Sequence, residues 1–422
     1  MKIIILGDGM ADLPYKIDAE SNKTTVKTPL EEAKTPIFDA LAPMSEIGLV
    51  KTVPEGMKPG SDIANLSVMG FNPSRYYTGR SPLEAISIGV NMKDSDLALR
   101  CNLVTLNGAE NFDDKVMIDY SADEISTDDA HTLINDLAKH LRDKGYNLLK
   151  DFDDSATGFE SFTFYGGVSY RNCLIISNGA HGTDCTPPHD ISRKKIGPYL
   201  PKGVYGKCFT EMIKVSYEFL SEHPVNIGRI KNFKRPANSI WLWGQGTKPV
   251  LGDFYKLTGR RGAVICAVDL IKGIGISAGM KVYEVDGATG NVHTNFRGKA
   301  ETVLTAIEDG CDFVYLHIEA ADESGHHGDR GDKILSIEKI DETTGFIKKR
   351  LDASGKSYTL MVLPDHPTPL ATMTHSSDPV PYMMFDSQKK LANGIGKYDE
   401  KAAKRGLFVE SGEALFKRFL DV

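Results

Sequence analysis

Short, mostly apolar runs that stop at glycine, proline or an acidic residue are the feature that most limits how this chain can fold. Five such runs lie at 3–6, 240–243, 263–268, 312–318 and 358–363. Runs without polar alternation are typical of parallel strands covered on both faces. Helical stretches, such as 299–308 and 332–352, lie between the later runs. This alternation predicts an α/β fold built on a doubly wound, mainly parallel sheet.

Polar side chains directly follow several of these runs. Asp8 follows the first run, Asp322 follows the run that ends at 318, and Asp365 and His366 follow the last run. Ligands of doubly wound sheets collect at the carboxyl ends of the strands, so we expect these side chains to share one edge. Taken alone, Asp8 has a simpler interpretation as a turn or capping residue.

The middle of the chain has a different pattern. Between about 97 and 222 it mixes strands with two amphipathic helices, expected around 126–144 and 208–221. This predicts a smaller α+β domain, residues 95–230, inserted into a metal-binding domain made of residues 1–94 and 231–422. The expected hinges lie near 92–95 and 224–236, where the second segment carries two prolines.

Composition narrows the class of protein. The 422 residues include 41% apolar and 25% charged residues, as in ordinary globular proteins, and the net charge is -7. A negative chain is a poor partner for nucleic acid, which usually needs a broad basic surface. Six cysteines without a C-x-x-C pair indicate reduced core thiols. No apolar run has membrane-spanning length, so we expect a cytoplasmic protein without a membrane partner.

Ser61 stands where a glycine-containing loop is expected to enter a helix that ends near Gly70. A hydroxyl there faces free backbone N–H groups and the positive end of the helix dipole, which favours an attached phosphate. Serine alone is a poor nucleophile and needs a base or a metal. The alternative is that Ser61 merely caps the helix, because serine is a leading cap residue.

Histidines accompany the two later carboxylates. Asp322 and His326 are four residues apart, so one helical turn places both on the same face. Asp365 and His366 form a doublet at a strand end, and His375 follows nine residues later. The alternatives are a surface Asp–His pair for the first two and an ordinary loop histidine for His375.

Each of these sequence signals is weak to moderate by itself, but their combination is strong evidence for a metal site. Three aspartates, three histidines and one serine suit two divalent cations of the Mn²⁺, Zn²⁺ or Mg²⁺ type. Two cations beside a serine are the arrangement for in-line phosphoryl transfer. A glycine-rich stretch at 273–279 lacks the G-x-G-x-x-G spacing, and the chain has no Walker A sequence, so no nucleotide is expected.

The order of these motifs resembles that of the alkaline phosphatase superfamily. The motifs are Gly7-Asp8-Gly9, Gly60-Ser61-Asp62-x-Ala64-Asn65, Asp322-x-x-x-His326, Asp365-His366 and His375. Within it, the segments 78–85, 241–246 and 269–273 make the chain similar to cofactor-independent phosphoglycerate mutases of the archaeal type, nearly end to end.

This resemblance implies two metal sites, with Mn²⁺ as the leading cation and Zn²⁺ or Mg²⁺ as alternatives. One site would use Asp322, His326 and His375. The other would use Asp8, Ser61, Asp365 and His366. Ser61 would take the phosphoryl group from 3-phosphoglycerate and return it to O2 of the glycerate. Lys272 matches a position that contacts phosphate.

One segment departs from the archaeal pattern. Where archaeal mutases typically read Thr-Asp-Pro-His, this chain has Thr186-Pro187-Pro188-His189-Asp190, which resembles a bacterial branch proposed to include homoserine kinases. Arg171 and His189 are candidates for binding the substrate, with surface or salt-bridged roles as the alternative. A homoserine kinase or another phosphotransferase therefore remains a rival activity. A non-catalytic protein with a structural metal pair is the third hypothesis, although structural sites are usually closed by protein ligands.

Overall fold

The computed structural model describes residues 1–16, 26–143, 161–389 and 391–421. The chain divides into two compact units. The first consists of Met1–Tyr77 and Val250–Val422, and the second of Thr78–Pro249. The chain therefore passes between units at 77/78 and 249/250, not at the expected 94/95 and 230/231.

The first unit is built around an eight-stranded sheet with the order β13-β12-β14-β1-β15-β16-β4-β17. The five strands from β13 to β15 are parallel, whereas β16 runs antiparallel to both of its neighbours. This confirms the mainly parallel sheet. The strands are β1 (Lys2–Gly7), β4 (Glu46–Val50), β12 (Gly262–Ile265), β13 (Lys281–Tyr283), β14 (Phe313–Ile318), β15 (Thr359–Leu363), β16 (Val380–Asp386) and β17 (Leu407–Val409).

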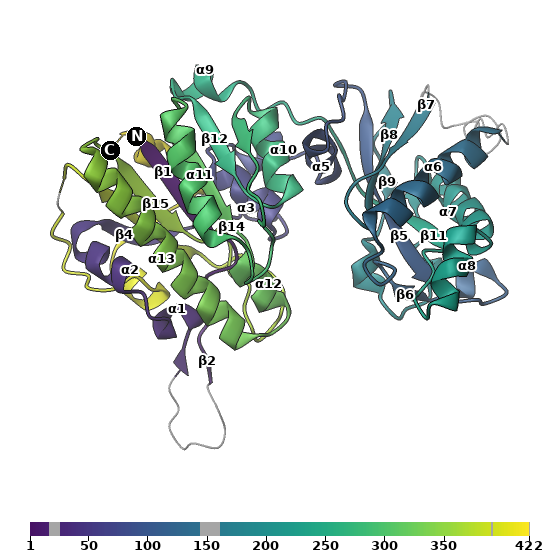
Figure 1. Ribbon diagram of the computed structural model, residues 1–422, viewed down its shortest axis with the longest axis horizontal. Coiled ribbons are helices and arrows are strands. Elements are labelled where there is room, and N and C mark those ends of the chain that lie inside the picture. Colours follow the sequence, from purple (N-terminus) through teal and green to yellow (C-terminus); the bar gives the residue numbers. More distant parts are fainter. Residues whose placement is uncertain (17–25, 144–160, 390, 422) are drawn as a thin grey trace. The chain divides into compact units, whose positions relative to one another are not determined.

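Helices cover the sheet because its central strands are apolar on both faces. On one face, α11 (Phe296–Glu308) and α13 (Arg330–Ser354) pack over Ile3 and Ile5 of β1 (Figure 1). On the other, Tyr315 of β14 reaches α3 (Ser61–Val68). The remaining helices are α1 (Pro29–Glu32), α2 (Pro36–Leu41), α4 (Pro73–Tyr76), α9 (Phe254–Thr258), α10 (Asp269–Ser277), α12 (Ala320–His326), α14 (Glu400–Ala403) and α15 (Gly412–Asp421). A short hairpin pairs β2 (Tyr15–Lys16) with β3 (Val26–Lys27).

The second unit contains an antiparallel sheet in the order β11-β5-β8-β7, with β6 also paired to β5. The strands are β5 (Leu97–Leu106), β6 (Met117–Asp119), β7 (Ser161–Tyr165), β8 (Arg171–Ser177) and β11 (Ser239–Thr247). The run at 240–243 is thus a strand, as expected, but it belongs to this sheet and not to the parallel one. Every residue of β5 is buried, which shows that an apolar run does not by itself identify a parallel strand.

Two long helices build most of the remaining core of this unit. In α6 (Thr127–Asp143), buried residues recur at helical spacing from Ala130 to Leu141. With α7 (Gly206–Ser221), this helix packs against a cluster that includes the fully buried Trp241. Both expected helices are therefore present, although position 144 lies outside the described residues. The short elements are α5 (Ser81–Ser87), β9 (Thr183–Asp184) and β10 (Lys202–Gly203).

The expected hinge at 224–236 is instead mostly helical. Pro224 begins α8 (Pro224–Lys231), where the missing N–H of proline costs nothing. Arg229 of this helix is buried and donates to the backbone oxygen of Ala122, so the segment belongs to the second unit. The other expected hinge, 92–95, also lies inside this unit, between α5 and β5.

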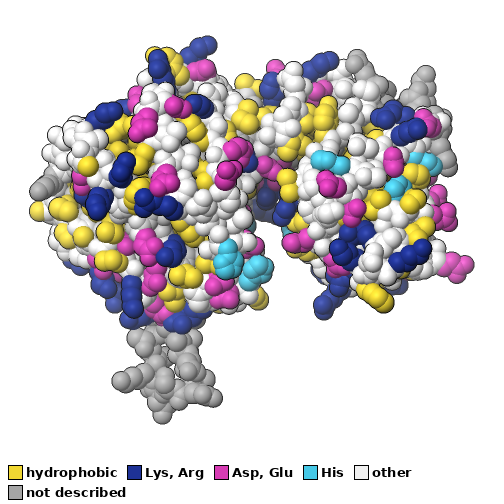
Figure 2. Space-filling model, in the orientation of Figure 1, with side chains coloured by type: hydrophobic (Ala, Val, Ile, Leu, Met, Phe, Trp, Pro, Cys, Tyr) yellow, Lys and Arg dark blue, Asp and Glu magenta, His cyan; other side chains and the backbone are white. Residues whose placement is uncertain are grey.

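Two surface properties bear on partners. Among the described residues, no helix is long and apolar enough to cross a bilayer. On the face drawn in Figure 2, Lys and Arg side chains are interspersed with Asp and Glu, in keeping with the net charge of -7. The absence of a nucleic-acid partner remains a prediction from composition.

Candidate active site

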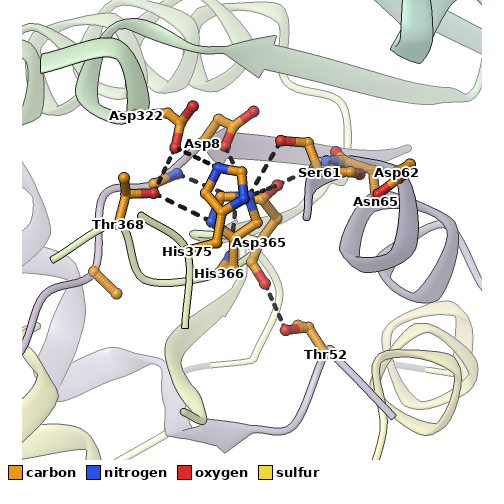
Figure 3. Close-up of polar contacts among 12 residues, drawn as sticks. Asp8, Thr52, Ser61, Asp62, Asn65, Asp322, Asp365, His366, Thr368 and His375 are labelled. Carbon is orange, nitrogen blue, oxygen red and sulfur yellow. Dashed lines mark hydrogen bonds and ion pairs between the residues drawn. The ribbon is translucent and has the colours of Figure 1, made fainter. Parts of the chain in front are cut away.

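Three neighbouring strands end at one edge of the parallel sheet, and each is followed by a carboxylate. β1 lies between β14 and β15 and is parallel to both. Asp8 follows β1, Asp322 lies in α12 just after β14, and Asp365 follows β15. Figure 3 shows these carboxylates gathered with His366 and His375. The topology of the sheet therefore brings together residues that lie far apart in the sequence.

A glycine allows the loop after β1 to approach Asp322. Gly9 has a φ of +62°, and a Cβ there would lie 2.5 Å from the Cα of Asp322. Its N–H donates to Asp365 Oδ1 at 3.2 Å. Any other residue would collide with Asp322, so Gly9 sets the spacing between the loops.

Ser61 occupies the first turn of α3, and Gly60 is the N-cap. The alternative interpretation, in which Ser61 merely caps the helix, is therefore wrong, because Gly60 occupies the cap position. Its Oγ instead lies 3.1 Å from His366 Nε2. Gly70, with a φ of +87°, terminates the helix as expected, through a hydrogen bond from Phe71 N to Leu66 O at 2.9 Å.

One potential cation-binding group consists of Asp8, Asp365 and His366, which are all buried. Each offers a ligand atom within 4.8 Å of the others. His366 Nε2 lies 3.5 Å from Asp8 Oδ1 and 3.4 Å from Asp365 Oδ2. Through its contact with His366, Ser61 lies beside this group, as the predicted set required.

A second group consists of Asp322, His366 and His375. His375 Nε2 lies 3.4 Å from Asp322 Oδ1, and His326 Nε2 lies 3.4 Å from Asp322 Oδ2. His326 is also 2.8 Å from His375, so all three residues of the predicted set are neighbours. Burial alone would raise the pKa of Asp322, but the hydrogen bonds from His326 and His375 hold it well below its usual value.

Glu319 was not among the expected ligands. It offers a carboxylate oxygen to a third group with Asp8 and Asp322. The signal was present in the sequence, because Glu319 directly follows the strand that precedes Asp322. Asp8 and Asp365 were predicted as ligands because each follows a strand, and Glu319 occupies the same kind of position.

The chemistry of these groups fits divalent cations. Asp8 is 1% exposed, and its Oδ1 makes no hydrogen bond within the described part of the chain. Burial, together with the charges of Asp365 and Asp322, raises the pKa of Asp8 well above its usual value. A bound cation would relieve this repulsion and use the free oxygen. Carboxylate oxygens with imidazole nitrogens are ligands that Mn²⁺, Zn²⁺ and related ions accept.

Comparison with known proteins identifies the family. Residues 42–226 match the family model of 2,3-bisphosphoglycerate-independent phosphoglycerate mutase. A protein of that name from Methanosarcina barkeri is 44% identical over 406 residues, which cover 96% of this chain and 94% of the relative. The chain belongs to the family of 2,3-bisphosphoglycerate-independent phosphoglycerate mutases. A probable mutase of Geobacter sulfurreducens is likewise 44% identical, over 99% of both chains.

Solved structures share the fold of this chain. A Pyrococcus horikoshii protein has 26% identity and a TM-score of 0.77, covering 100% of this chain and 96% of its own. The cofactor-independent phosphoglycerate mutase of Thermoplasma acidophilum, 22% identical with a TM-score of 0.59, covers 100% of this chain and 99% of its own and shares the fold.

In this member of the mutase family, Asn65 joins Ser61, the predicted nucleophile, to the candidate ligand group. Its amide nitrogen donates to Asp365 Oδ2 and to the Ser61 backbone oxygen, both at 2.8 Å. The Tyr315 hydroxyl donates to Asn65 Oδ1 at 2.6 Å and so fixes which end of the amide faces Asp365. The family motif marked Asn65, but no sequence signal marked Tyr315.

His317 orients Asp8 from within β14. Both side chains are buried, and His317 Nε2 lies 2.9 Å from Asp8 Oδ2. Burial and the charge of Lys299 lower the pKa of His317 to about 3, so the ring is neutral. With its proton on Nε2, it donates to Oδ2 and leaves Oδ1 available to a cation.

Lys272 lies in α10 of the first unit. It forms ion pairs with Glu284 at 2.9 Å and with Asp269 at 3.8 Å. Burial alone would lower the pKa of Lys272, but the hydrogen bond and charge of Glu284 raise it above its usual value. Lys272 is therefore a paired cation, and a contact with phosphate remains a prediction.

The other two predicted substrate residues, Arg171 and His189, lie in the second unit. The guanidinium of Arg171 lies over the Tyr170 ring at 4.5 Å, and His189 is 5.3 Å from the Trp243 ring. Another arginine, Arg100, also lies over Trp243, at 4.5 Å. These contacts place cations and aromatic rings close together in this unit, and substrate binding there remains a prediction.

Proposed function

We propose that the protein interconverts 3-phosphoglycerate and 2-phosphoglycerate without 2,3-bisphosphoglycerate, through a phosphoserine at Ser61. The observation that carries the proposal is the position of Ser61 Oγ, 3.1 Å from His366 Nε2 and at the start of α3, beside two groups that could hold a cation. The names of relatives that match almost the whole chain support the same activity.

Two divalent cations are part of this proposal, with Mn²⁺ as the leading candidate. Asp8, Ser61, Asp365 and His366 would hold one, and Asp322, His326 and His375 the other. Bound cations would neutralise phosphoryl oxygens and favour the ionised form of the serine hydroxyl. The fully buried Asp365 and His366 would keep the reacting hydroxyl in a fixed position.

The transfer proceeds in two balanced displacements. Ser61 Oγ attacks phosphorus as the bond from phosphorus to O3 of the substrate breaks, and the proton lost by Oγ is balanced by one gained at O3, which leaves phosphoserine and glycerate. In the second step, O2 of the glycerate attacks phosphorus as the bond to Oγ breaks, and the proton lost by O2 is balanced by one gained at Oγ. The N–H groups of the first turn of α3 favour the phosphoryl charge in both steps.

The rival activity, that of a homoserine kinase, was suggested by residues 186–190, where the sequence differs from the typical archaeal pattern. In the structure this segment enters a short 3₁₀ turn, Pro188–Ile191, and the Trp241 indole donates to the Thr186 backbone oxygen at 2.8 Å. The segment at 186–190 is thus held in place within the second unit. Nothing in its geometry favours a kinase, and the mutase remains the proposal. A cytoplasmic location remains a prediction.

A phosphorus NMR time course tests the activity. The purified full chain with Mn²⁺ and 3-phosphoglycerate should produce the 2-phosphoglycerate resonance without added bisphosphoglycerate. A parallel sample should contain ATP and homoserine. Absence of the isomer, together with phosphorylation of homoserine, would overturn the mutase proposal.

A further inference from the structure

A fully buried lysine joins two of the loops that carry the candidate ligands. Lys333 of α13 is 0% exposed. Its ammonium donates to Asp12 Oδ2 at 2.7 Å, to the Thr368 backbone oxygen at 2.7 Å and to the Ala11 backbone oxygen at 3.2 Å. These bonds use all three donors of the ammonium. They tie the loop after β1 to the loop after β15.

Thr368 extends this connection to both ligand groups. Its hydroxyl donates to Asp322 Oδ1 at 2.5 Å, and its oxygen lies 3.3 Å from His366 Nδ1. Because the hydroxyl has one proton and gives it to Asp322, its oxygen is left to accept from Nδ1–H of His366. That tautomer leaves the Nε2 lone pair facing Ser61 and Asp8.

We propose that Lys333 is a positioning residue that acts through Thr368 to hold Asp322 and His366 in the orientation that binds divalent cations. Lys333 hydrogen-bonds neither side chain directly, so its effect is transmitted by the loop at 368. A buried ammonium paired with Asp12 is a rigid anchor, because either charge alone would be strongly disfavoured in the interior. The inference rests on the proposed metal site and extends it to the residues that shape it.

The test measures Mn²⁺ binding to metal-free protein by the electron paramagnetic resonance of free Mn²⁺. Lys333→Met alone would leave the Asp12 carboxylate buried without its partner, which can prevent folding. The variant to use is therefore Lys333→Met combined with Asp12→Asn, which removes both charges. We expect its Mn²⁺ affinity to fall about 10- to 100-fold, as when other residues that orient metal ligands are lost.

Thr368→Val provides a second test that keeps the lysine and its backbone acceptor. It removes only the hydroxyl between Asp322 and His366, and the same loss of affinity is expected. The matched control is Lys2→Met, because Lys2 is also a buried lysine, but it begins β1 at the opposite end of the strands. Its Mn²⁺ affinity should equal that of the wild type.

The outcomes separate this inference from the proposed function. If the wild type does not bind Mn²⁺, the metal site itself is wrong. If the wild type binds and the double variant binds equally well, the role of Lys333 is overturned. If the double variant does not fold, Thr368→Val decides: unchanged affinity overturns the connection through Thr368, and reduced affinity supports it.

Discussion

At the scale of single residues, the proposed nucleophile, Ser61, is separate from the cap of its own helix. Gly60 is the N-cap of α3, so the Ser61 side chain is free to face His366 and is not used to satisfy backbone N–H groups. The helix supplies its N-terminal dipole without using the hydroxyl. Function and helix stability at this position therefore depend on different atoms.

This separation gives a direct prediction for Ser61→Ala. Turnover should fall by at least about 10³-fold, because the substitution removes the hydroxyl that is proposed to accept the phosphoryl group. The melting temperature should change by less than about 2 °C, because the cap is kept. Steady-state kinetics and thermal unfolding measure the two effects. Ser74→Ala, at an exposed serine, is the control, and substantial residual turnover in Ser61→Ala would show that Ser61 is not the nucleophile.

A second prediction concerns Tyr315→Phe. Without the hydroxyl, the Asn65 amide can rotate and turn its oxygen toward Asp365. We expect kcat to fall about tenfold, as for other groups that orient ligands. Tyr398→Phe is a matched control, because that buried hydroxyl donates to backbone oxygens of Val362 and Pro381 instead. Equal kinetics for the two variants would contradict the role of Tyr315.

At the scale of elements, α13 does more than cover the sheet. From this helix, Asp341 accepts hydrogen bonds from Phe38 N at 2.7 Å and Ile37 N at 3.3 Å, and so caps the start of α2. Lys333 on the same helix anchors the two loops. A single helix therefore links the N-terminal segment to the edge that carries the site.

The Asp341 cap predicts a dependence of stability on pH. Burial raises the pKa of Asp341 from 3.8 to about 6. The folded state then holds a proton that the unfolded state has released, so the free energy of unfolding should decline as pH rises from about 4 to about 6. In Asp341→Asn this part of the decline should disappear. Urea titrations at several pH values measure it, and parallel curves for both proteins would contradict the assignment.

The elements also show where sequence reasoning succeeded and failed. β1, β14 and β15 were predictable because each is apolar on both faces and ends at a chemically distinctive residue. β11 has the same apolar pattern, yet it lies in an antiparallel sheet, because burial and not strand direction produces that pattern. Pro224 suggested a hinge but begins a helix. Glu319 was missed although it follows a strand, and Tyr315 and Lys333 carry no motif, because their roles depend on tertiary contacts.

At the scale of the whole molecule, every candidate cation ligand belongs to the first unit. The raised pKa of Asp8 reflects burial together with the repulsion from the neighbouring carboxylates. Cation binding should therefore couple to the stability of this unit.

Metal removal gives the corresponding prediction. Adding Mn²⁺ to metal-free protein should raise the melting temperature, because binding to the folded state alone contributes about 2.7 kcal/mol at a hundredfold excess over Kd. Chelation by EDTA should reverse the shift and abolish turnover. Potassium chloride at the same ionic strength is the control for charge screening. A melting temperature insensitive to Mn²⁺ would contradict the metal site.

The pairing of β1 also constrains how the chain is made. β1 is synthesised long before its partners in the sheet, β14 and β15, which follow more than 300 residues later. All the strands of the second unit leave the ribosome before either partner does. Contacts of such long range slow folding and leave apolar segments exposed to aggregation. A nascent chain halted before residue 313 therefore carries the strands of the second unit together with an apolar β1 whose partners β14 and β15 have not yet been made.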